Sequence, residues 1–289
     1  MPSLRGLYEE TIKRLTEAGI EEREAETESV LLMEYVFGVG RAKLYADGEE
    51  ELTDESKLGQ FSELVQKRTT RIPLQHLTGI QSFMGLDFYV DENVLIPRPD
   101  TEILVEEAMK EIGDGMKVLD LCTGSGCILL SLMKYKNGIE GVASDISKKA
   151  LEVAKKNAER LGITENIRFT ESDLFEAFEK DERFDAILSN PPYIRTEEIQ
   201  SLMPEVREHD PLAALDGGKD GLVFYRRIIE NAKDYLMLSG LLMLEIGYDQ
   251  GKAVSRLLKE CGYTGIEVLK DYGGNDRVVR ARVPVKVPD

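Results

Sequence analysis

The spacing of apolar residues changes several times along the chain. Up to about residue 75 it follows a helical period, as in residues 21–38, where apolar or small side chains recur every three or four positions and Gly38 follows the last of them. Residues 52–71 repeat this pattern, with Thr53 as the expected N-cap. The pattern predicts a small helical domain over residues 1–78.

Residues 82–100 switch to alternating apolar and polar positions, which is the period of a β-strand. Residues 91–93 (Asp-Glu-Asn) favour a turn before the apolar residues 94–96. We therefore predict a β-hairpin within a linker of residues 79–97. A helix is expected to follow, with Asp100 or Thr101 as its N-cap.

The remainder of the chain alternates between strand-like and helix-like segments. The expected strands are residues 117–122, 138–145, 167–173, 183–190 and 240–247. The expected helices between them are residues 126–135, 147–162, 221–236 and 250–262, and an antiparallel strand pair follows at residues 263–271 and 277–285. This alternation predicts an α/β domain over residues 98–289 with a doubly wound, mostly parallel sheet. Ligands of such sheets bind beyond the carboxyl ends of the strands.

Composition and charge narrow the possible functions. The 289 residues are 42% hydrophobic, and none of their apolar runs is long enough for a transmembrane helix. A signal peptide is not expected at the charged N-terminus, and three cysteines without a Cys-x-x-Cys pair favour a cytoplasmic protein with neither disulfides nor a zinc site. A net charge of −17 is unfavourable for binding a phosphate backbone and favours a basic partner.

Residues 122–126, Cys-Thr-Gly-Ser-Gly, separate the first expected strand of the sheet from a helix, and we call them the glycine loop. A dinucleotide-binding loop would require a third glycine where Leu129 stands, and the Gly-Lys-Ser/Thr of a P-loop is missing. Asp145 follows Gly126 by 19 residues and ends the second strand, where a carboxylate can accept two ribose hydroxyl groups. Asp173 ends the third strand and could face an adenine edge. We predict a site for a nucleoside with a small charged tail.

Residues 190–193 (Asn-Pro-Pro-Tyr) end the fourth strand on the same rim, and we call them the Asn-Pro-Pro-Tyr loop. The Asn190 side-chain oxygen and the Pro191 carbonyl can accept the two N–H groups of a planar amine or amide. This would hold a poorly nucleophilic nitrogen in line with an electrophilic methyl group. Tyr193 offers a flat apolar face, and the prolines stiffen the backbone.

Together the two loops resemble class I S-adenosylmethionine-dependent methyltransferases that act on amino or amide groups, with Cys122 in place of the usual first glycine. The resemblance extends to one family, the peptide chain release factor glutamine N5-methyltransferases. The matching segments are Arg71–Gly79, Val94–Glu106, residues 119–126, residues 189–194, Glu205–Ile228 and Leu244–Gly247.

The resemblance implies a seven-stranded Rossmann-like methyltransferase sheet, and a helical domain that docks a release factor presenting its Gly-Gly-Gln glutamine. It also implies particular roles for individual residues. The cofactor-binding residues would be Cys122, Thr123, Gly124, Ser125, Gly126, Asp145, Asp173, Leu174 and Asn190, with Leu174 at a position often filled by an aromatic residue. The glutamine would bind Asn190, Pro191, Pro192 and Tyr193, with Asn190, Pro191 and Tyr193 catalytic. No metal, membrane or nucleic-acid partner is expected, and the expected state is a monomer.

Three alternatives stay open at this point. The same chemistry would serve a glutamine of a ribosomal protein. An N6-adenine methyltransferase acting on nucleic acid shares the Asn-Pro-Pro-Tyr signature, but it should carry a basic groove. A binding protein that has lost catalysis is disfavoured, because Asp145 and Asn190 are both present.

Overall fold

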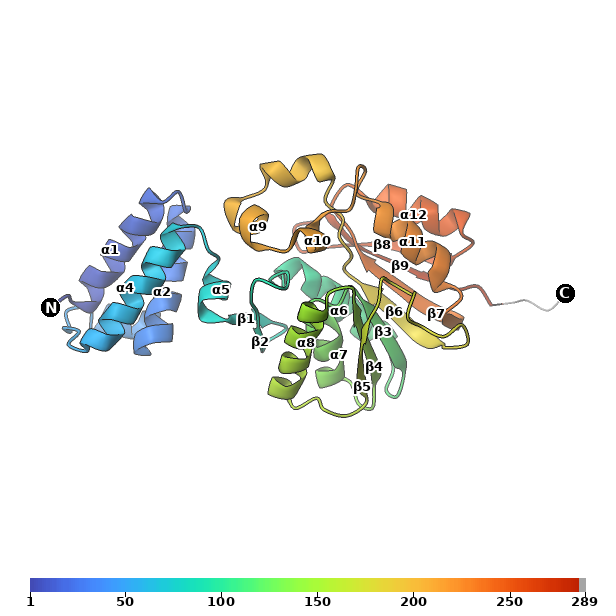
Figure 1. The fold of residues 1–289 in the computed structure, drawn as a ribbon, viewed down its shortest axis with the longest axis horizontal. Helices are drawn as coiled ribbons and strands as arrows, with labels where there is room; N and C mark the ends of the chain where they lie inside the picture. Colours follow the sequence, from blue (N-terminus) through green and yellow to red (C-terminus); the bar gives the residue numbers. More distant parts are fainter. Residues whose placement is uncertain (286–289) are drawn as a thin grey trace. The chain divides into compact units, whose positions relative to one another are not determined.

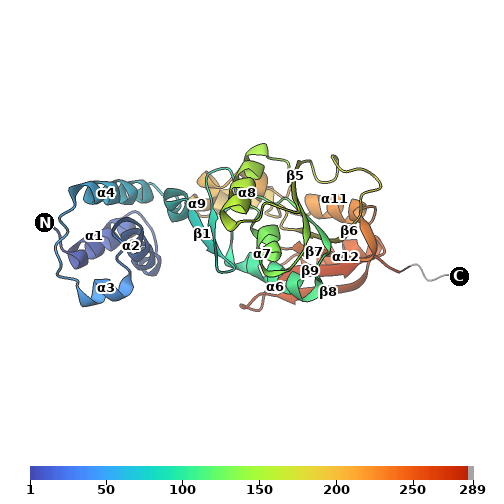
Figure 2. The same cartoon turned by 90° about the horizontal axis from the view of Figure 1, so that it is seen from below.

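A computed structural model of the protein describes residues 1–285. The chain forms two compact units that divide after Gly79 (Figures 1 and 2). Each unit has its own hydrophobic core. Within residues 1–285, none of the helices is both long and apolar enough to span a membrane.

The first unit consists of five helices: α1 (Leu4–Glu17), α2 (Glu22–Phe37), α3 (Arg41–Ala46), α4 (Glu55–Thr69) and α5 (Leu74–Thr78). Gly38 ends α2 in the left-handed conformation, as the pattern predicted. The N-cap of α4 is Asp54 rather than Thr53, because the Asp54 carboxylate accepts the Lys57 N–H at 3.1 Å. The Arg68 guanidinium is fully buried and paired with Glu28 at 2.7 Å.

The predicted hairpin is present, but its turn lies earlier than expected. Strands β1 (Ile80–Phe83) and β2 (Leu86–Tyr89) pair antiparallel around Met84 and Gly85, whose φ angles of 52° and 71° are both positive. Positive φ at both central residues is typical of the tight turn that matches strand twist. The turn predicted at residues 91–93 is present, with the Val94 N–H donating to the Asp91 carbonyl at 3.3 Å, but it follows the hairpin and does not join its two strands, and residues 94–96 form no strand. Phe83 and Phe88 anchor the hairpin in a core of the second unit.

Helix α6 (Pro99–Glu111) begins one or two residues before the predicted caps. Its N-cap is Arg98, because Pro99 occupies the first helical position, where a missing N–H has no cost. Asp100 and Thr101 therefore lie in the first turn of the helix. Thr101 is only 2% exposed, so its side chain points into the protein.

The second unit is built on a seven-stranded sheet in the order β5-β4-β3-β6-β7-β9-β8. The strands are β3 (Lys117–Leu121), β4 (Glu140–Asp145), β5 (Ile167–Glu171), β6 (Phe184–Ser189), β7 (Leu236–Glu245), β8 (Thr264–Lys270) and β9 (Asp276–Arg282). The first five run parallel, and β9 pairs antiparallel with both β7 and β8. The predicted α/β class, the doubly wound sheet and the terminal antiparallel pair are confirmed.

Helices cover both faces of this sheet (Figure 1). On one face α6, α7 (Cys127–Tyr135) and α8 (Lys148–Leu161) pack on side chains such as Val118 and Leu188. On the other face, α11 (Val223–Ala232) and α12 (Gly251–Glu260) pack on Leu119 and Ile187, which follow Val118 and precede Leu188 in their strands. This alternation follows from the two-residue period of a strand.

The direction of the strand order reverses between β3 and β6, and this reversal positions the site. Both loops that the sequence singled out leave the sheet there, one after β3 and the other after β6. A long connection follows β6 and contains the short helices η1 (Thr196–Ser201), α9 (Pro204–His209) and α10 (Leu212–Leu215). Such a reversal leaves a crevice beyond the carboxyl ends of the strands.

Candidate active site

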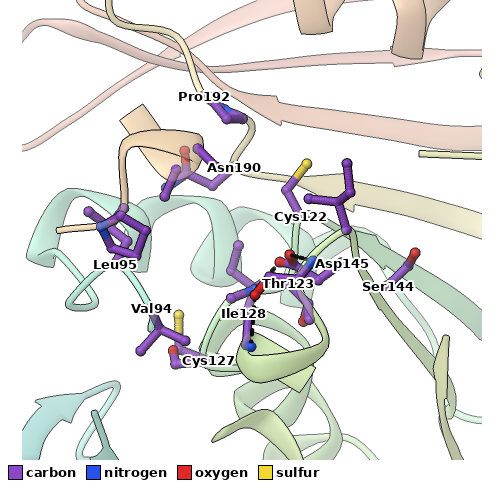
Figure 3. Close-up of a pocket in the computed structure, with 18 of the residues that line it drawn as sticks. Val94, Leu95, Cys122, Thr123, Cys127, Ile128, Ser144, Asp145, Asn190 and Pro192 are labelled. Atoms are coloured by element: carbon purple, nitrogen blue, oxygen red, sulfur yellow. Dashed lines mark hydrogen bonds between the residues drawn. The ribbon is translucent and has the colours of Figure 1, made fainter. Parts of the chain in front are cut away.

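A cavity of about 280 Å³ occupies this crevice (Figure 3). The predicted site residues in its lining are Cys122, Thr123, Gly124, Ser125, Asp145, Asp173, Leu174, Asn190 and Pro192. The tertiary structure thus gathers residues from the ends of four strands around one cavity. Among the described residues, Gly126, Pro191 and Tyr193 adjoin this lining without being part of it.

The glycine loop owes its shape to left-handed backbone. Cys122, Gly124 and Gly126 have φ angles of 58°, 54° and 81°. A side chain on Gly126 would bring its Cβ within 2.9 Å of Leu130 Cδ1, so this glycine also permits α7 to pack closely. Cys122 adopts a conformation that normally favours glycine, and burial raises the pKa of its thiol, which therefore stays neutral in the cavity wall.

Asp145, at the end of β4, holds the glycine loop at the end of β3. Its Oδ2 accepts the Gly124 N–H at 2.9 Å, and its Oδ1 accepts the Ser147 N–H at 2.9 Å. Burial raises the pKa of Asp145, and these two hydrogen bonds act in the opposite direction. Since each carboxylate oxygen has a second lone pair, the group can still accept ligand hydroxyls.

Asp120 lies beneath the same loop and is completely buried. Its Oδ2 accepts the Thr123 hydroxyl at 2.6 Å, which fixes the start of the turn. Burial raises the pKa of Asp120 to about 7, against the opposing effect of the Thr123 hydrogen bond. Thr123 thereby has a structural partner in addition to its place in the cavity wall.

The loop after β5 contributes one apolar and one charged group. Leu174 has a φ angle of 55°, and its carbonyl accepts the Ser172 hydroxyl at 2.8 Å. The Asp173 carboxylate lies 2.9 Å from the Arg227 guanidinium of α11. Asp173 is thus in the cavity wall but carries an ion pair that sequence reasoning missed, and its contact with an adenine stays a prediction.

The Asn-Pro-Pro-Tyr loop is held at both ends by side chains from other elements. Asn190 Nδ2 donates to Thr101 Oγ1 of α6 at 3.3 Å, and the Tyr193 hydroxyl donates to Glu245 Oε1 at 3.4 Å. Gln250 Nε2 donates to the Tyr193 carbonyl at 3.0 Å. Because Nδ2 is engaged with Thr101, the Asn190 carbonyl oxygen is the end that remains for a ligand.

The connection after β6 packs directly on this loop. Ile194 and Asp216 form a parallel β-bridge, and a Cβ on Gly217 would lie 2.7 Å from Tyr193 Cα, so no side chain is tolerated there. Farther along, Asp210 Oδ2 pairs with the Arg98 guanidinium at 2.8 Å, and Asp210 is buried.

Comparison with known proteins identifies the family. A family model described as "PrmC N-terminal domain" matches residues 7–79, and one described as "Methyltransferase small domain" matches residues 99–208. A release factor glutamine methyltransferase from Clostridium acetobutylicum is 43% identical over 88% of this chain and 90% of its own length. The chain belongs to the release factor glutamine methyltransferase family.

Further relatives agree with this assignment. The release factor glutamine methyltransferase of Geobacter sulfurreducens is 42% identical over 97% of both chains. A methyltransferase structure from Pyrococcus furiosus superimposes with a TM-score of 0.54 at 18% identity, covering 71% of this chain and 92% of that one. The latter likeness concerns the fold alone, and it confirms the predicted methyltransferase sheet.

The cavity fits the S-adenosylmethionine of a methyltransferase in three respects. Gly124 has open space where a Cβ would stand, so a ligand can approach its backbone closely. The half-buried Asp145 carboxylate stands at the end of β4, where a ribose would bind. Ile146 is 61% exposed although it borders the cavity, and with Leu174 it offers apolar surface for a flat base.

Sequence reasoning missed several members of this release factor glutamine methyltransferase site. Thr101 was considered only as a helix cap, yet it contacts Asn190. Residues 93–95 and the segment containing Pro211, Ala213 and Ala214 also line the cavity. The signal available for them was indirect. Apart from Asn93, these residues lie within the matching stretches, but they carry no charged or nucleophilic side chain that would point to chemistry.

Proposed function

We propose that this protein transfers a methyl group from S-adenosylmethionine to the side-chain amide nitrogen of the glutamine in the Gly-Gly-Gln motif of peptide chain release factors. The observation that carries the proposal is the orientation of Asn190. Its Nδ2 is turned to Thr101, which leaves its carbonyl oxygen as an acceptor for a substrate N–H. An adjoining cavity large enough for part of a nucleoside ligand supports the same reading.

The residues that would hold the cofactor are those of the glycine loop, with Asp145 for the ribose and Leu174, Ile146 and Asp173 around the base. When bound, S-adenosylmethionine supplies an electrophilic methyl group on a sulfonium. The protein's own residues orient the cofactor and the substrate amide, exclude water and provide hydrogen-bond acceptors. The glycine loop contributes to orientation through its backbone, which a ligand can approach closely at Gly124 because a Cβ there would meet open space.

The Asn-Pro-Pro-Tyr loop would hold the acceptor amide. The Asn190 carbonyl oxygen and the Pro191 carbonyl accept its two N–H groups, and Tyr193 lies against its flat face. These contacts favour a localised lone pair on the nitrogen and stabilise the positive charge that develops there. Fixing the reacting groups in attack geometry can contribute about 7–11 kcal/mol. A general base is not needed before attack, because the proton can leave after the nitrogen is methylated.

The helical unit, residues 1–78 in our domain division, would dock the release factor. Its helix α2 exposes Glu22, Glu26 and Glu34 as well as Leu31 and Tyr35, so it carries both negative charge and apolar side chains at its surface. A protein domain that contacts ribosomal RNA is basic and complements such a face. We further propose a cytoplasmic monomer that binds no nucleic acid directly, consistent with the formal net charge of −17.

The direct test uses labelled S-adenosylmethionine and two forms of a release factor, one intact and one with the Gly-Gly-Gln glutamine changed to alanine. Label in the intact factor alone is the expected result. Label in neither form, with the cofactor still bound, would overturn the assignment of the release factor as the substrate. A ribosomal protein with an exposed glutamine would then be assayed next, because the chemistry at Asn190 would be the same.

Docking by the helical unit has its own test. Changing Glu22, Glu26 and Glu34 together to lysine should raise the KM for the release factor and leave the Kd for S-adenosylmethionine unchanged. Glu230→Lys and Glu260→Lys, which change exposed positions on α11 and α12, serve as controls. An equal effect of both sets would argue for general electrostatic attraction rather than a docking face.

A further inference from the structure

The Asn190 side-chain amide has two ends of nearly the same shape, and only one of them suits the reaction. The carbonyl end accepts a substrate N–H, whereas the NH₂ end would repel it. What decides between the two orientations must therefore lie on the side away from the cavity. Figure 3 shows Asn190 at the cavity wall, and its Nδ2 contacts Thr101 Oγ1 at 3.3 Å.

A threonine hydroxyl alone cannot decide the orientation, because it both donates and accepts hydrogen bonds. If its proton were free, Thr101 could equally donate to the carbonyl oxygen of a turned Asn190 amide. The proton therefore has to be taken by another group. Thr101 is 2% exposed, which leaves water little access to its hydroxyl.

Glu245, at the end of β7, is the group that can take this proton. Its side chain is 2% exposed, and the Thr101 hydroxyl faces its carboxyl and lowers its pKa. Oε1 accepts the Tyr193 hydroxyl, whereas the buried Oε2 has no hydrogen-bond partner within ordinary geometry among residues 1–285. An ionised carboxylate only accepts, so a Thr101 hydroxyl that turns its proton toward Glu245 keeps an acceptor lone pair for Asn190.

We propose that Thr101 and Glu245 are positioning residues that set which end of the Asn190 amide faces the substrate. Glu245 would orient both ends of the Asn-Pro-Pro-Tyr loop, Tyr193 directly and Asn190 through Thr101. The link between Glu245 and catalysis rests on the proposed function of Asn190. The orientation of the amide itself does not depend on the identity of the substrate.

The proposal has a consequence for pH. A protonated Glu245 can donate to Thr101, which frees the Thr101 proton for the Asn190 oxygen and turns the amide the wrong way. Burial raises the pKa of Glu245 to about 7, so kcat should fall as the pH is lowered through this value. The titratable or charged groups around Glu245 are Asp100 on α6, Cys127 on α7, Tyr193, Tyr225 on α11 and Arg277 on β9.

The first test compares Thr101→Val, which keeps the shape but removes the hydroxyl, with Thr101→Ser, which keeps the hydroxyl. We expect Thr101→Val to lower kcat about ten- to a hundredfold while the Kd for S-adenosylmethionine and the KM for the release factor stay within about threefold. Thr101→Ser should restore most of kcat. Equal kcat in the valine and serine variants would overturn the proposal. Thr11→Val, an equally buried change in α1, controls for general destabilisation.

The second test uses Glu245→Gln, whose side chain has no charge to titrate. The fall of kcat at low pH that we expect for the wild type should disappear in this variant. An unchanged fall would place the titrating group elsewhere and overturn the role of Glu245. This variant keeps the proposal testable even if Thr101→Val does not fold.

A spectroscopic readout separates this proposal from the proposed substrate. The side-chain ¹⁵N–¹H₂ signal of Asn190, assigned by its loss in Asn190→Ala, should shift in Thr101→Val but not in Thr101→Ser. It should also shift as the pH is lowered through about 7. This spectrum needs no acceptor protein, so a release factor that is not methylated would overturn the proposed function and leave this result standing. An Asn190 signal unaffected by Thr101→Val would overturn the positioning role.

Discussion

The glycine loop after β3 and the Asn-Pro-Pro-Tyr loop after β6 face one cavity but are built in opposite ways. The first uses residues with positive φ and exposes its backbone at Gly124. The second uses two buried prolines and offers side-chain and carbonyl acceptors. One loop lets a ligand approach the main chain, and the other holds a few acceptors still.

The side chains that hold the two loops in place also differ. The glycine loop is fastened by two carboxylates, Asp120 beneath it and Asp145, which also faces the cavity. The Asn-Pro-Pro-Tyr loop is held from behind by Thr101, Glu245 and Gln250, of which only Thr101 is in the cavity lining. Changes on the first loop should therefore affect binding, and changes on the second should affect the chemical step. The predictions below test that division.

The largest effect is expected at the Asn-Pro-Pro-Tyr loop. Asn190→Ala removes an acceptor that stabilises charge developing on the substrate nitrogen, and we expect kcat to fall roughly a hundred- to a thousandfold. The Kd for S-adenosylmethionine, measured by calorimetry, should change by less than about threefold. A large loss of cofactor affinity with little change in kcat would reverse the roles of the two loops.

Asp145→Ala should give the converse result. It removes the proposed acceptor of the ribose hydroxyls and also frees the Gly124 N–H, so we expect the Kd for S-adenosylmethionine to rise roughly ten- to a hundredfold. At saturating cofactor, kcat should be affected much less. Equal affinity in the wild type and Asp145→Ala would refute the assignment.

Gly217→Ala probes the packing that supports the Asn-Pro-Pro-Tyr loop. Its new Cβ would lie 2.7 Å from Tyr193 Cα, so the loop must shift, at a cost of about 1–3 kcal/mol in the free energy of unfolding. The kcat should fall more than cofactor affinity does. Gly59→Ala in α4, where a Cβ meets open space, is the matched control and should stabilise the protein by about 0.5–1 kcal/mol. Similar unfolding curves for both variants would contradict the steric argument.

The smallest effect is expected for Cys122→Gly. Glycine relieves the positive φ of 58°, while its greater freedom in the unfolded chain opposes that gain. The free energy of unfolding should therefore change by less than about 1 kcal/mol, measured by denaturant titration. A larger loss would mean that the Cys122 side chain contributes mainly through packing against the core that it adjoins.

The sequence by itself determined the fold class and the two loops. Alternating segments specify a doubly wound sheet because each strand and helix must bury its own apolar face, and that requirement is local. The two loops could also be predicted from their glycines and prolines. The backbone freedom of glycine and the stiffness of proline are properties of the residue itself. Errors occurred at boundaries, as at Asp54 and Pro99, where neighbouring residues compete for the same cap.

Only the tertiary structure decided how the loops are held. Asn190 meets Thr101 across 89 positions of the chain, and Tyr193 meets Glu245 across 52. Nothing in the local pattern distinguishes Thr101 from a helix cap or Glu245 from a strand-end carboxylate. Their roles arise from burial beside particular partners, because a hydrogen bond in a dry interior depends on which groups the packed elements bring together.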